Sequence, residues 1–140
     1  MIVSTAVLCL AASLYHEARG EGIVGQYAVA LVTMNRSKQQ NKPVCDVVFQ
    51  PKQFSWTNKH VTRTDSGWKL SSRLHPKDTD AWQRAVRIAQ VTLDGRMYDF
   101  TKGSMFYHAK TVSPAWSRKM KPTKVVGNHH FYALPTVSQS

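Results

Sequence analysis

Acidic side chains are scarce in this chain, where 8 Asp+Glu stand against 19 Lys+Arg and the formal net charge is +11. Such a positive field attracts polyanions, among them nucleic acids, anionic lipids and acidic polymers of cell walls. The basic residues are scattered rather than clustered, and the sequence has no recognisable DNA-reading helix and no arginine-rich tail. Charge alone therefore does not select one of these partners.

Long apolar runs are also absent. No segment approaches the roughly 18 uninterrupted apolar residues of a membrane-spanning helix. Residues 1–15 are largely apolar, but they lack the basic start of a secretory signal, and the run continues straight into His16 and Glu17. We therefore expect a first helix in place of a cleaved leader, with no export signal and no stable membrane insertion.

Cysteine is limited to Cys9 and Cys45. The two could pair, but Cys9 lies within an apolar helical pattern, which favours a small buried thiol. The sequence has no CxxC motif and no His/Cys cluster, so it predicts no structural zinc site.

Several enzyme motifs are missing as well. The zinc-peptidase motif H-E-x-x-H begins at His16, but Gly20 occupies the place of its second histidine. There is no G-x-S-x-G elbow and no glycine-rich phosphate loop. We therefore predict no metal and no cofactor. Three later histidines lie in aromatic segments, where a structural role is more usual than metal binding: His108, His129 and His130.

The length suits one domain over residues 1–140. Short aromatic segments at 105–109 and 129–134 predict strands, and residues 52–76 lack periodicity and predict a long loop. A short turn or strand is expected within 43–51. The fold class is thus α+β, mainly helical with a small antiparallel sheet. Apolar periodicity predicts helices over Ile2 to about Arg19, Gln26 to Arg36, and Asp80 to about Leu93.

The only two glutamates, Glu17 and Glu21, lie four residues apart in the stretch LYHEARGEG. Cleaving a glycosidic bond requires a carboxyl group that can protonate the leaving oxygen, and burial against apolar surface raises the pKa of such a group. Glu17 fits, because it ends an apolar helix whose C-terminal end disfavours negative charge. Glu21 could be a second carboxylate of the site. Since Gly20 is expected to end the helix before it, Glu21 could instead form a structural ion pair, for example with Arg36.

The stretch LYHEARGEGIVGQYAVALVTMNR (14–36) resembles the signature of the cell-wall hydrolases related to the spore-cortex-lytic enzyme of germinating bacterial spores. That family also includes phage endolysins. Three later segments match in order, VCDVVFQPKQFSW, MFYHAKTVSPAW and VGNHHFY, so that the resemblance covers about residues 10–132. It implies a lysozyme-like fold similar to lytic transglycosylases, with a helical lobe and a small sheet bordering a cleft.

The resemblance implies cleavage of the β-1,4 bond between N-acetylmuramic acid and N-acetylglucosamine in peptidoglycan. In such transglycosylases one glutamate protonates the glycosidic oxygen and then, as a carboxylate, takes the proton of the muramic 6-hydroxyl, which closes a 1,6-anhydro ring. Glu17 corresponds to that residue. Successive strand residues point to opposite faces, so only one of Tyr107 and His108 is expected to line the cleft. The substrate-binding residues that the resemblance implies are Gln53, Phe54, Trp56, Tyr107, His108, Trp116 and Tyr132.

The expected protein is thus a monomeric peptidoglycan-degrading enzyme that does not bind nucleic acid and has no separate wall-binding domain. As a phage endolysin it would be made in the host cytoplasm, where Cys9 and Cys45 would stay thiols, and then be released onto the wall. Three alternatives stay open: a hydrolytic muramidase that uses a second carboxylate, a basic binding module without enzymatic activity, and a metal-dependent amidase or peptidase.

Overall fold

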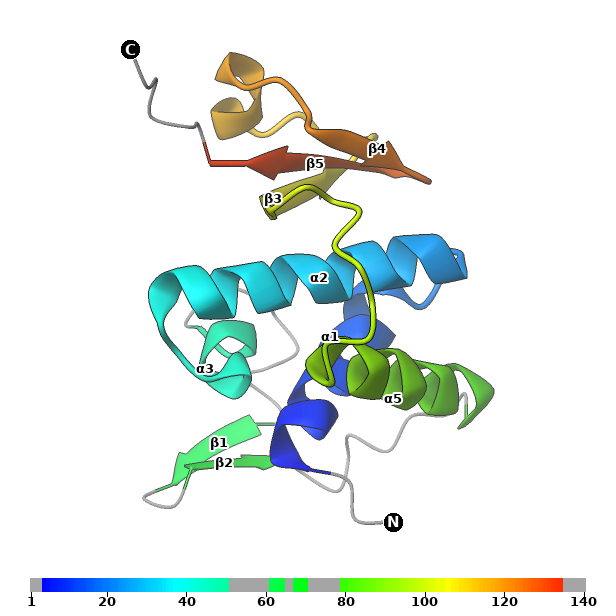
Figure 1. The fold of residues 1–140 in the computed structure, drawn as a ribbon, viewed down its shortest axis with the longest axis vertical. Helices are drawn as coiled ribbons and strands as arrows, with labels where there is room; N and C mark the ends of the chain where they lie inside the picture. The colour runs from blue at the N-terminus through cyan, green and yellow to red at the C-terminus, as the bar shows by residue number, and fades with distance from the viewer. Residues whose placement is uncertain (1–3, 51–60, 65–66, 71–78, 135–140) are drawn as a thin grey trace.

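The computed structural model describes residues 4–50, 61–64, 67–70 and 79–134, with only the backbone given for 61–64 and 67–70. Helix α2 lies between a layer of helices and a three-stranded sheet (Figure 1). This α+β architecture confirms the predicted fold class. In chain order the elements are α1 (Thr5–Ala18), α2 (Ile23–Gln40), α3 (Val44–Val48), β1 (Val61–Thr64), β2 (Gly67–Leu70), α5 (Thr79–Leu93), β3 (Ser104–Ala109), the 3-10 helix η2 (Ala115–Lys119), β4 (Lys124–Val126) and β5 (His129–Ala133).

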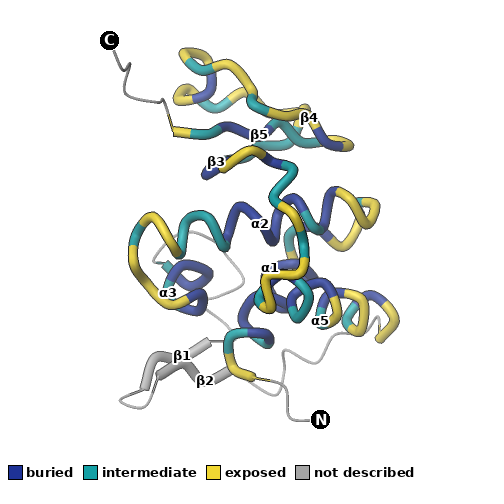
Figure 2. The backbone as a smooth tube through the Cα atoms, viewed as in Figure 1, coloured by how far each residue is buried: buried dark blue, intermediate teal, exposed yellow. Residues whose placement is uncertain are grey.

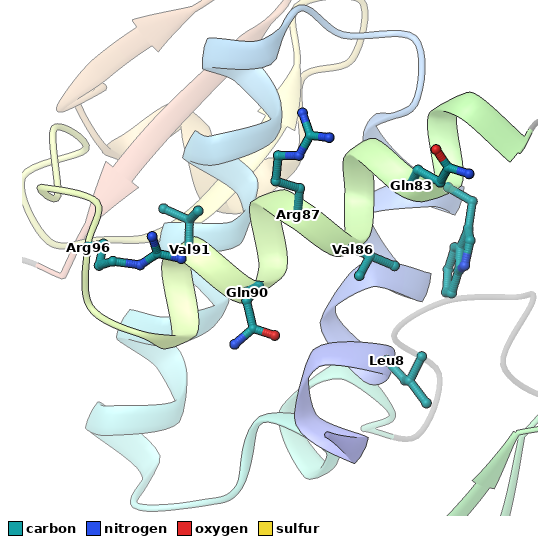
Figure 3. A pocket seen from close by; sticks show the side chains of 8 residues that line it. Leu8, Gln83, Val86, Arg87, Gln90, Val91 and Arg96 are labelled. Atoms are coloured by element: carbon teal, nitrogen blue, oxygen red, sulfur yellow. The ribbon is translucent and has the colours of Figure 1, made fainter. Parts of the chain in front are cut away.

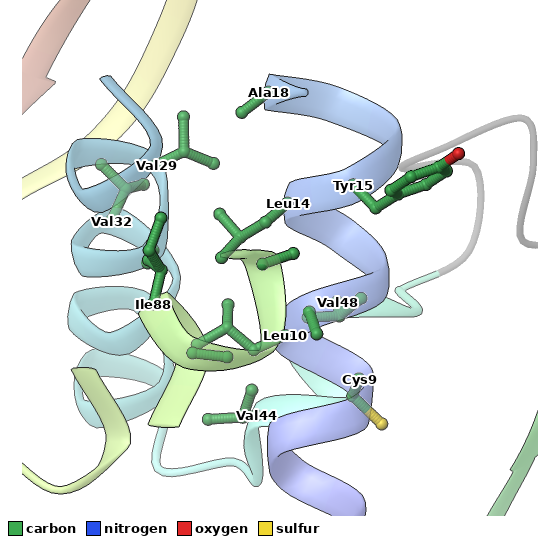
Figure 4. Packing of buried hydrophobic residues seen from close by; sticks show 14 of the residues in the cluster. Cys9, Leu10, Leu14, Tyr15, Ala18, Val29, Val32, Val44, Val48 and Ile88 are labelled. Carbon is green, nitrogen blue, oxygen red and sulfur yellow. The ribbon is translucent and has the colours of Figure 1, made fainter. Parts of the chain in front are cut away.

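Helix α1 is the centre of the helical layer. The Ser4 hydroxyl caps it by accepting a hydrogen bond from the Val7 N–H at 3.2 Å. Residues 9–15 are all buried, because α1 packs against α2, α3 and α5 at once. Figure 4 shows Leu10 and Leu14 among side chains from the neighbouring helices. A helix that is apolar on nearly every side needs such neighbours on every side.

Helix α2 is longer at both ends than the predicted range of Gln26 to Arg36. It begins after Gly22 and ends at Asn41, whose left-handed backbone (φ +52°) closes the last turn. The apolar pattern marks only the middle of the helix, since this is the part that is buried between the two layers (Figure 2).

The segment expected to be a short turn or strand within 43–51 is instead helix α3. Pro43 is the N-cap of this helix. A backbone N–H at the start of a helix has no acceptor within the helix, so the missing N–H of proline costs nothing there, and Pro43 can begin the helix.

The two cysteines are not thiols, and this corrects the sequence-based expectation. Cys9 and Cys45 form a disulfide with a Cα–Cα separation of 5.3 Å. The physical reason is the packing of α3 against α1, which brings the two residues together across 36 positions of sequence. An apolar helical position is therefore compatible with a cross-link here.

The expected long loop at 52–76 contains an antiparallel hairpin, in which Val61 pairs with Leu70 and Thr64 with Gly67. Each strand has only four residues, too few for a clear alternation of apolar and polar side chains. The remaining positions of 52–76 lie outside the described residues.

The C-terminal sheet has the strand order β3-β5-β4, and both pairings are antiparallel. Both predicted aromatic strands are confirmed as β3 and β5, whereas β4 lies between them in a segment where no strand was predicted. Phe131 of β5 is fully buried and belongs to the core shared with α1 and α2. Among helices of the described residues, none combines the length and apolar character needed to cross a bilayer.

The disulfide generates a stability prediction. Replacing Cys9 and Cys45 together by Ala should lower the free energy of unfolding by about 3–4 kcal/mol, because the unfolded chain regains the freedom of a 36-residue loop. Denaturant unfolding with and without reductant measures this. The double variant should be indifferent to reductant, and equal stabilities of the oxidised and reduced wild type would contradict the cross-link.

Candidate functional site

Glu17 lies on the last turn of α1 and is half-buried. The helix stops one residue later, and the Glu21 N–H donates to the Ala18 carbonyl at 2.9 Å to form a tight turn. The glutamate thus stands at the end of a fully packed helix, where the chain turns toward α2. This is the position that the sequence predicted for it.

Tyr107 of β3 faces this helix end. Burial of its hydroxyl raises the pKa of Tyr107 well above its usual value, the negative charge of Glu17 raises it further, and the positive charge of Arg36 partly opposes the shift. The phenol therefore stays protonated and can donate a hydrogen bond throughout the neutral range. Tyr107 of β3 is thus within electrostatic reach of Glu17 from α1 and of Arg36 from α2.

Arg36 brings a half-buried positive charge to the same region. Its Nη2 atom donates to Gln50 Oε1 at 3.1 Å, and Gln50 Nε2 donates to Gln40 Oε1 at 2.6 Å. Burial lowers the pKa of Arg36, and the nearby Tyr107 partly offsets this, but a guanidinium keeps its proton in proteins. Sequence reasoning named Arg36 only as a possible partner of Glu21.

The neighbouring residue, Asn35, ties α2 to the start of the sheet. Its side-chain amide donates to Asp99 Oδ2 at 2.9 Å and to the Ser104 carbonyl at 3.1 Å. Burial alone would raise the pKa of Asp99, but hydrogen bonds from Thr101, Asn35 and Gly103 outweigh it and lower the pKa. These contacts fix β3, and with it Tyr107, against α2.

Glu21 is held between the turn and β5. Its Oε1 atom lies 3.0 Å from Nδ1 of His129, and both side chains are nearly buried, at 13% and 12% exposure. Its backbone carbonyl accepts a hydrogen bond from Gln26 Nε2 at 2.9 Å. Two glycines leave room for the carboxylate, because a Cβ at Gly127 would lie 3.0 Å from Glu21 Oε2 and one at Gly25 would lie 3.1 Å from Glu21 Cβ. These contacts favour the structural interpretation of Glu21, with His129 as its partner.

Arg19 points along a different side of α1. Its guanidinium lies 4.4 Å from the centre of the Tyr15 ring and donates to the Tyr15 hydroxyl. Tyr15 in turn contacts Trp82 of α5 edge-on, with ring centres 6.2 Å apart. Positions two apart on a helix point in nearly opposite directions, so Arg19 and Glu17 diverge. Arg19 therefore packs on Tyr15, and Tyr15 makes the contact with α5.

The predicted substrate-binding residues that the structure describes lie on, or pack against, both faces of the sheet. Tyr107 shares the α2 face with His129 and Phe131, whose ring centres lie 5.5 and 5.7 Å from its own. His108 lies on the other face and contacts Tyr132 and Trp116. As expected from strand geometry, only one of Tyr107 and His108 faces the Glu17 side. Substrate contact stays a prediction for all of these residues, and Gln53, Phe54 and Trp56 lie outside the described residues.

A separate hollow of about 530 Å³ opens between α1 and α5 (Figure 3). Among the described residues none that lines this hollow carries a carboxyl group, so these walls offer no proton for glycosidic cleavage. The described residues in its walls are Leu8, Trp82, Gln83, Val86, Arg87, Gln90, Val91 and Arg96. Elsewhere in the part of the chain that the structure describes, no three His, Cys, Asp or Glu side chains gather as a metal site would require.

Removing the charge of Glu21 should cost stability. We expect Glu21→Gln to lower the free energy of unfolding by about 1–3 kcal/mol, because it leaves a nearly buried histidine without its charged partner. A double-mutant cycle with His129→Gln should give a coupling energy of about 1 kcal/mol or more. Asp94→Asn, which breaks the exposed pair with Arg96, is the control and should change stability by at most about 0.5 kcal/mol. Additive effects of the Glu21 and His129 substitutions would refute the pairing.

Crowding at Gly127 gives an independent measurement of the same contact. Gly127 and Gly95 both have left-handed backbones, with φ of +53° and +71°, but only Gly127 has the Glu21 carboxylate beside it. Ala at either position should be strained, and Gly127→Ala should cost about 1–2 kcal/mol more than Gly95→Ala. Equal losses in thermal unfolding of the two variants would show that Glu21 does not lie against Gly127.

Two solved structures are similar to this chain over nearly its whole length. The catalytic domain of the germination-specific lytic transglycosylase SleB from Bacillus anthracis has a TM-score of 0.68 and 24% identity, covering 92% of this chain and 95% of that one. The catalytic domain of the Bacillus cereus SleB protein has a TM-score of 0.62 and 26% identity, covering 94% and 92%. Among curated protein sequences, none matches this chain.

A family model described as cell wall hydrolase matches residues 20–132. The matched range includes Glu21, Arg36, Tyr107 and His129, and it begins three residues after Glu17. Since it covers most of the 140 residues, the chain belongs to the cell wall hydrolase family.

Proposed function

We propose that this protein degrades peptidoglycan by cleaving the β-1,4 bond between N-acetylmuramic acid and N-acetylglucosamine, as a lytic transglycosylase with Glu17 as its acid and base. The observation that carries the proposal is the place of Glu17, a half-buried carboxyl group at the end of α1 within electrostatic reach of the buried Tyr107 hydroxyl. Membership of the cell wall hydrolase family and the fold shared with a protein described as a lytic transglycosylase support it.

In the first step the protonated Glu17 carboxyl gives its proton to the glycosidic oxygen, and the bond to the anomeric carbon of muramic acid breaks. In the second step the Glu17 carboxylate takes the proton of the muramic 6-hydroxyl, whose oxygen bonds to the anomeric carbon. The product carries a 1,6-anhydro ring, and Glu17 is protonated again. No water enters, so the reaction needs a single carboxyl group.

The scarcity of free carboxylates supports this route over hydrolysis. A hydrolytic enzyme needs a second carboxylate that activates water or attacks the sugar. Glu21 is bound to His129, and Asp99 accepts hydrogen bonds from Asn35, Thr101 and Gly103. Asp46 and Asp80 lie in the first turns of α3 and α5, and Asp94 pairs with Arg96. Asp65 and Asp78 lie outside the described residues.

Tyr107 and Arg36 would assist the two steps. The Arg36 guanidinium adds a positive charge within electrostatic reach of the Tyr107 hydroxyl, and Glu17 lies within reach of the same hydroxyl. The Tyr107 hydroxyl is a permanent donor and can orient either the Glu17 carboxylate or a sugar oxygen. Both act through fixed electrostatics, which cost little reorganisation during the reaction.

The role of a phage endolysin, predicted from the sequence resemblance, is part of the same proposal. The disulfide between Cys9 and Cys45 would form once the protein leaves the reducing cytoplasm. The enzyme would then reach its fully cross-linked state on the side of the membrane where the wall lies.

The substitution Glu17→Gln tests the mechanism. Glutamine keeps the size of the side chain but cannot give up a proton, so cleavage of purified peptidoglycan should fall roughly 100- to 10,000-fold with an unchanged melting temperature. Asp94→Asn removes one carboxylate from an exposed pair and is the matched control, with activity close to wild type. Retained cleavage by the Glu17→Gln variant would remove Glu17 from the mechanism.

Mass spectrometry of the released muropeptides separates the competing functions. A transglycosylase leaves 1,6-anhydro-muramic ends, each lighter by one water than the reducing ends left by a muramidase. A metal-dependent amidase would release new amino groups and lose activity with a chelator, and a binding module would leave the polymer intact. Anhydro ends in the wild-type digest are the result that we expect.

A further inference from the structure

The sheet carries aromatic side chains on the face directed away from α2. In the pairing of β3 with β5, Phe106 lies opposite Tyr132 and His108 opposite His130, so these four side chains share one face. Together with Trp116 of η2 we call them the outer aromatic face. Figure 1 shows η2 beyond the sheet on the side away from α2, which fits its contact with this face. Tyr107 lies between Phe106 and His108 on β3, so its side chain is on the opposite face of the sheet, within electrostatic reach of Glu17.

The outer aromatic face is a closely connected cluster. The His108 ring stacks on Tyr132 with ring centres 5.3 Å apart, and its Nε2 atom lies 2.7 Å from the Tyr132 hydroxyl. His130 lies 5.2 Å from His108 by the same measure. Trp116 then covers the cluster, with ring centres 5.1 Å from Tyr132 and 5.6 Å from Phe106. These contacts hold the indole in a fixed orientation.

Trp116 nevertheless presents much of its ring to solvent, with 42% of the residue exposed. The short helix that carries it is anchored by the buried Ser117, whose hydroxyl donates to the Pro114 carbonyl at 2.7 Å. On β4, Val125 lies opposite His130 and is also exposed. A rigid and accessible aromatic ring of this kind is the usual platform for the apolar face of a sugar ring.

The charged residues of the segment that carries this face are all basic. Residues 100–140 contain no Asp or Glu, and they contain six Lys or Arg residues. The 8 acidic residues of the chain thus all lie within residues 1–99, together with the other 13 of its 19 basic residues. Five of the six basic residues lie on or between the strands and η2 and are exposed: Lys110, Arg118, Lys119, Lys121 and Lys124.

We propose that the outer aromatic face is a second binding surface for peptidoglycan, separate from the cleavage site, that holds a neighbouring glycan strand through Trp116 and the surrounding lysines and arginines. The sugar ring would stack on the indole, and the carboxylates of the peptide side chains would meet the positive charges. The identity of the polymer rests on the proposed function. The surface itself rests on the exposed ring and on the exposed basic residues of the same segment.

A glycan fits this surface better than a single-stranded nucleic acid does. Nucleic acid platforms offer several exposed rings to successive bases. Here Trp116 is the exposed ring, while Tyr132 is buried beneath it and His108 and His130 are only partly accessible. One ring surrounded by dispersed positive charge suits a polymer of saturated rings with carboxylates at intervals.

The experiment measures cosedimentation of the full chain with purified insoluble peptidoglycan, in a Glu17→Gln background so that the polymer stays intact. We expect Trp116→Ala to weaken binding roughly three- to tenfold, the usual range for one aromatic contact. Tyr98→Ala is the matched control, because Tyr98 is 80% exposed and lies in the connection between α5 and β3. It should change binding less than twofold.

A second pair of variants tests the charge without touching the aromatic cluster. Lys119→Gln with Lys121→Gln should weaken binding at low salt, and the difference from the parent should shrink as salt rises. Arg84→Gln with Arg87→Gln removes the same charge from exposed positions of α5 and should have a smaller effect. If Trp116→Ala fails to fold by circular dichroism, Trp116→Phe and the lysine pair decide the question.

Equal binding by the outer-face variants and their controls would overturn the proposal. The proposal would also be overturned if Trp116→Ala weakened the binding of single-stranded DNA but left the binding of peptidoglycan unchanged. Cleavage by the wild-type enzyme is measured separately on the same polymer. Cleavage without Trp116-dependent binding removes only the second surface, whereas Trp116-dependent binding without cleavage removes only the proposed activity.

Discussion

The contact between the Glu21 carboxyl group and the His129 imidazole joins the turn after α1 to strand β5, next to Glu17. Glu21 follows Glu17 by four residues, and its N–H is bound to the Ala18 carbonyl at the end of α1. Fixing Glu21 therefore restricts the conformational freedom of that helix end. Because β5 pairs with β3, the same contact brings Tyr107 to the helix end. The close fit of the Glu21 carboxylate against Gly25 and Gly127 shows how little room this junction leaves for other side chains. Glu21 thus helps to fix the position of Glu17.

This arrangement explains why a strongly basic chain keeps both glutamates in one short stretch. One carboxylate holds the helical layer and the sheet together, and the other stands where the two layers meet. The buried Tyr107 hydroxyl lies within electrostatic reach of this second carboxylate, Glu17, and the half-buried Arg36 lies within reach of the same hydroxyl. Most of the other charged residues of the chain are basic, and residues 100–140 contain no Asp or Glu. The protein thereby combines the Glu17 carboxyl group with a basic surface that would attract a polyanionic polymer.

Much of the fold could be predicted from the sequence, because its signals are local. The apolar periodicity of α1 and α5, the aromatic strands β3 and β5, and the opposite faces of Tyr107 and His108 all follow from neighbouring residues. What could not be predicted depends on packing between distant segments. The pairing of Cys9 with Cys45 follows from the contact of α3 with α1. The contact of Glu21 with His129 joins residues near the two ends of the sequence. The hairpin of β1 and β2 and the three-residue β4 are too short to show a period.

The most direct measurement of the central claim is a structure of the Glu17→Gln protein bound to an oligomer of alternating N-acetylglucosamine and N-acetylmuramic acid. If Glu17 is the acid, the oxygen of a muramic–glucosamine bond should lie within hydrogen-bonding distance of the side chain at position 17, on the face of the sheet that carries Tyr107. An oligomer that binds only elsewhere, for example in the hollow between α1 and α5, with no sugar near position 17, would contradict it.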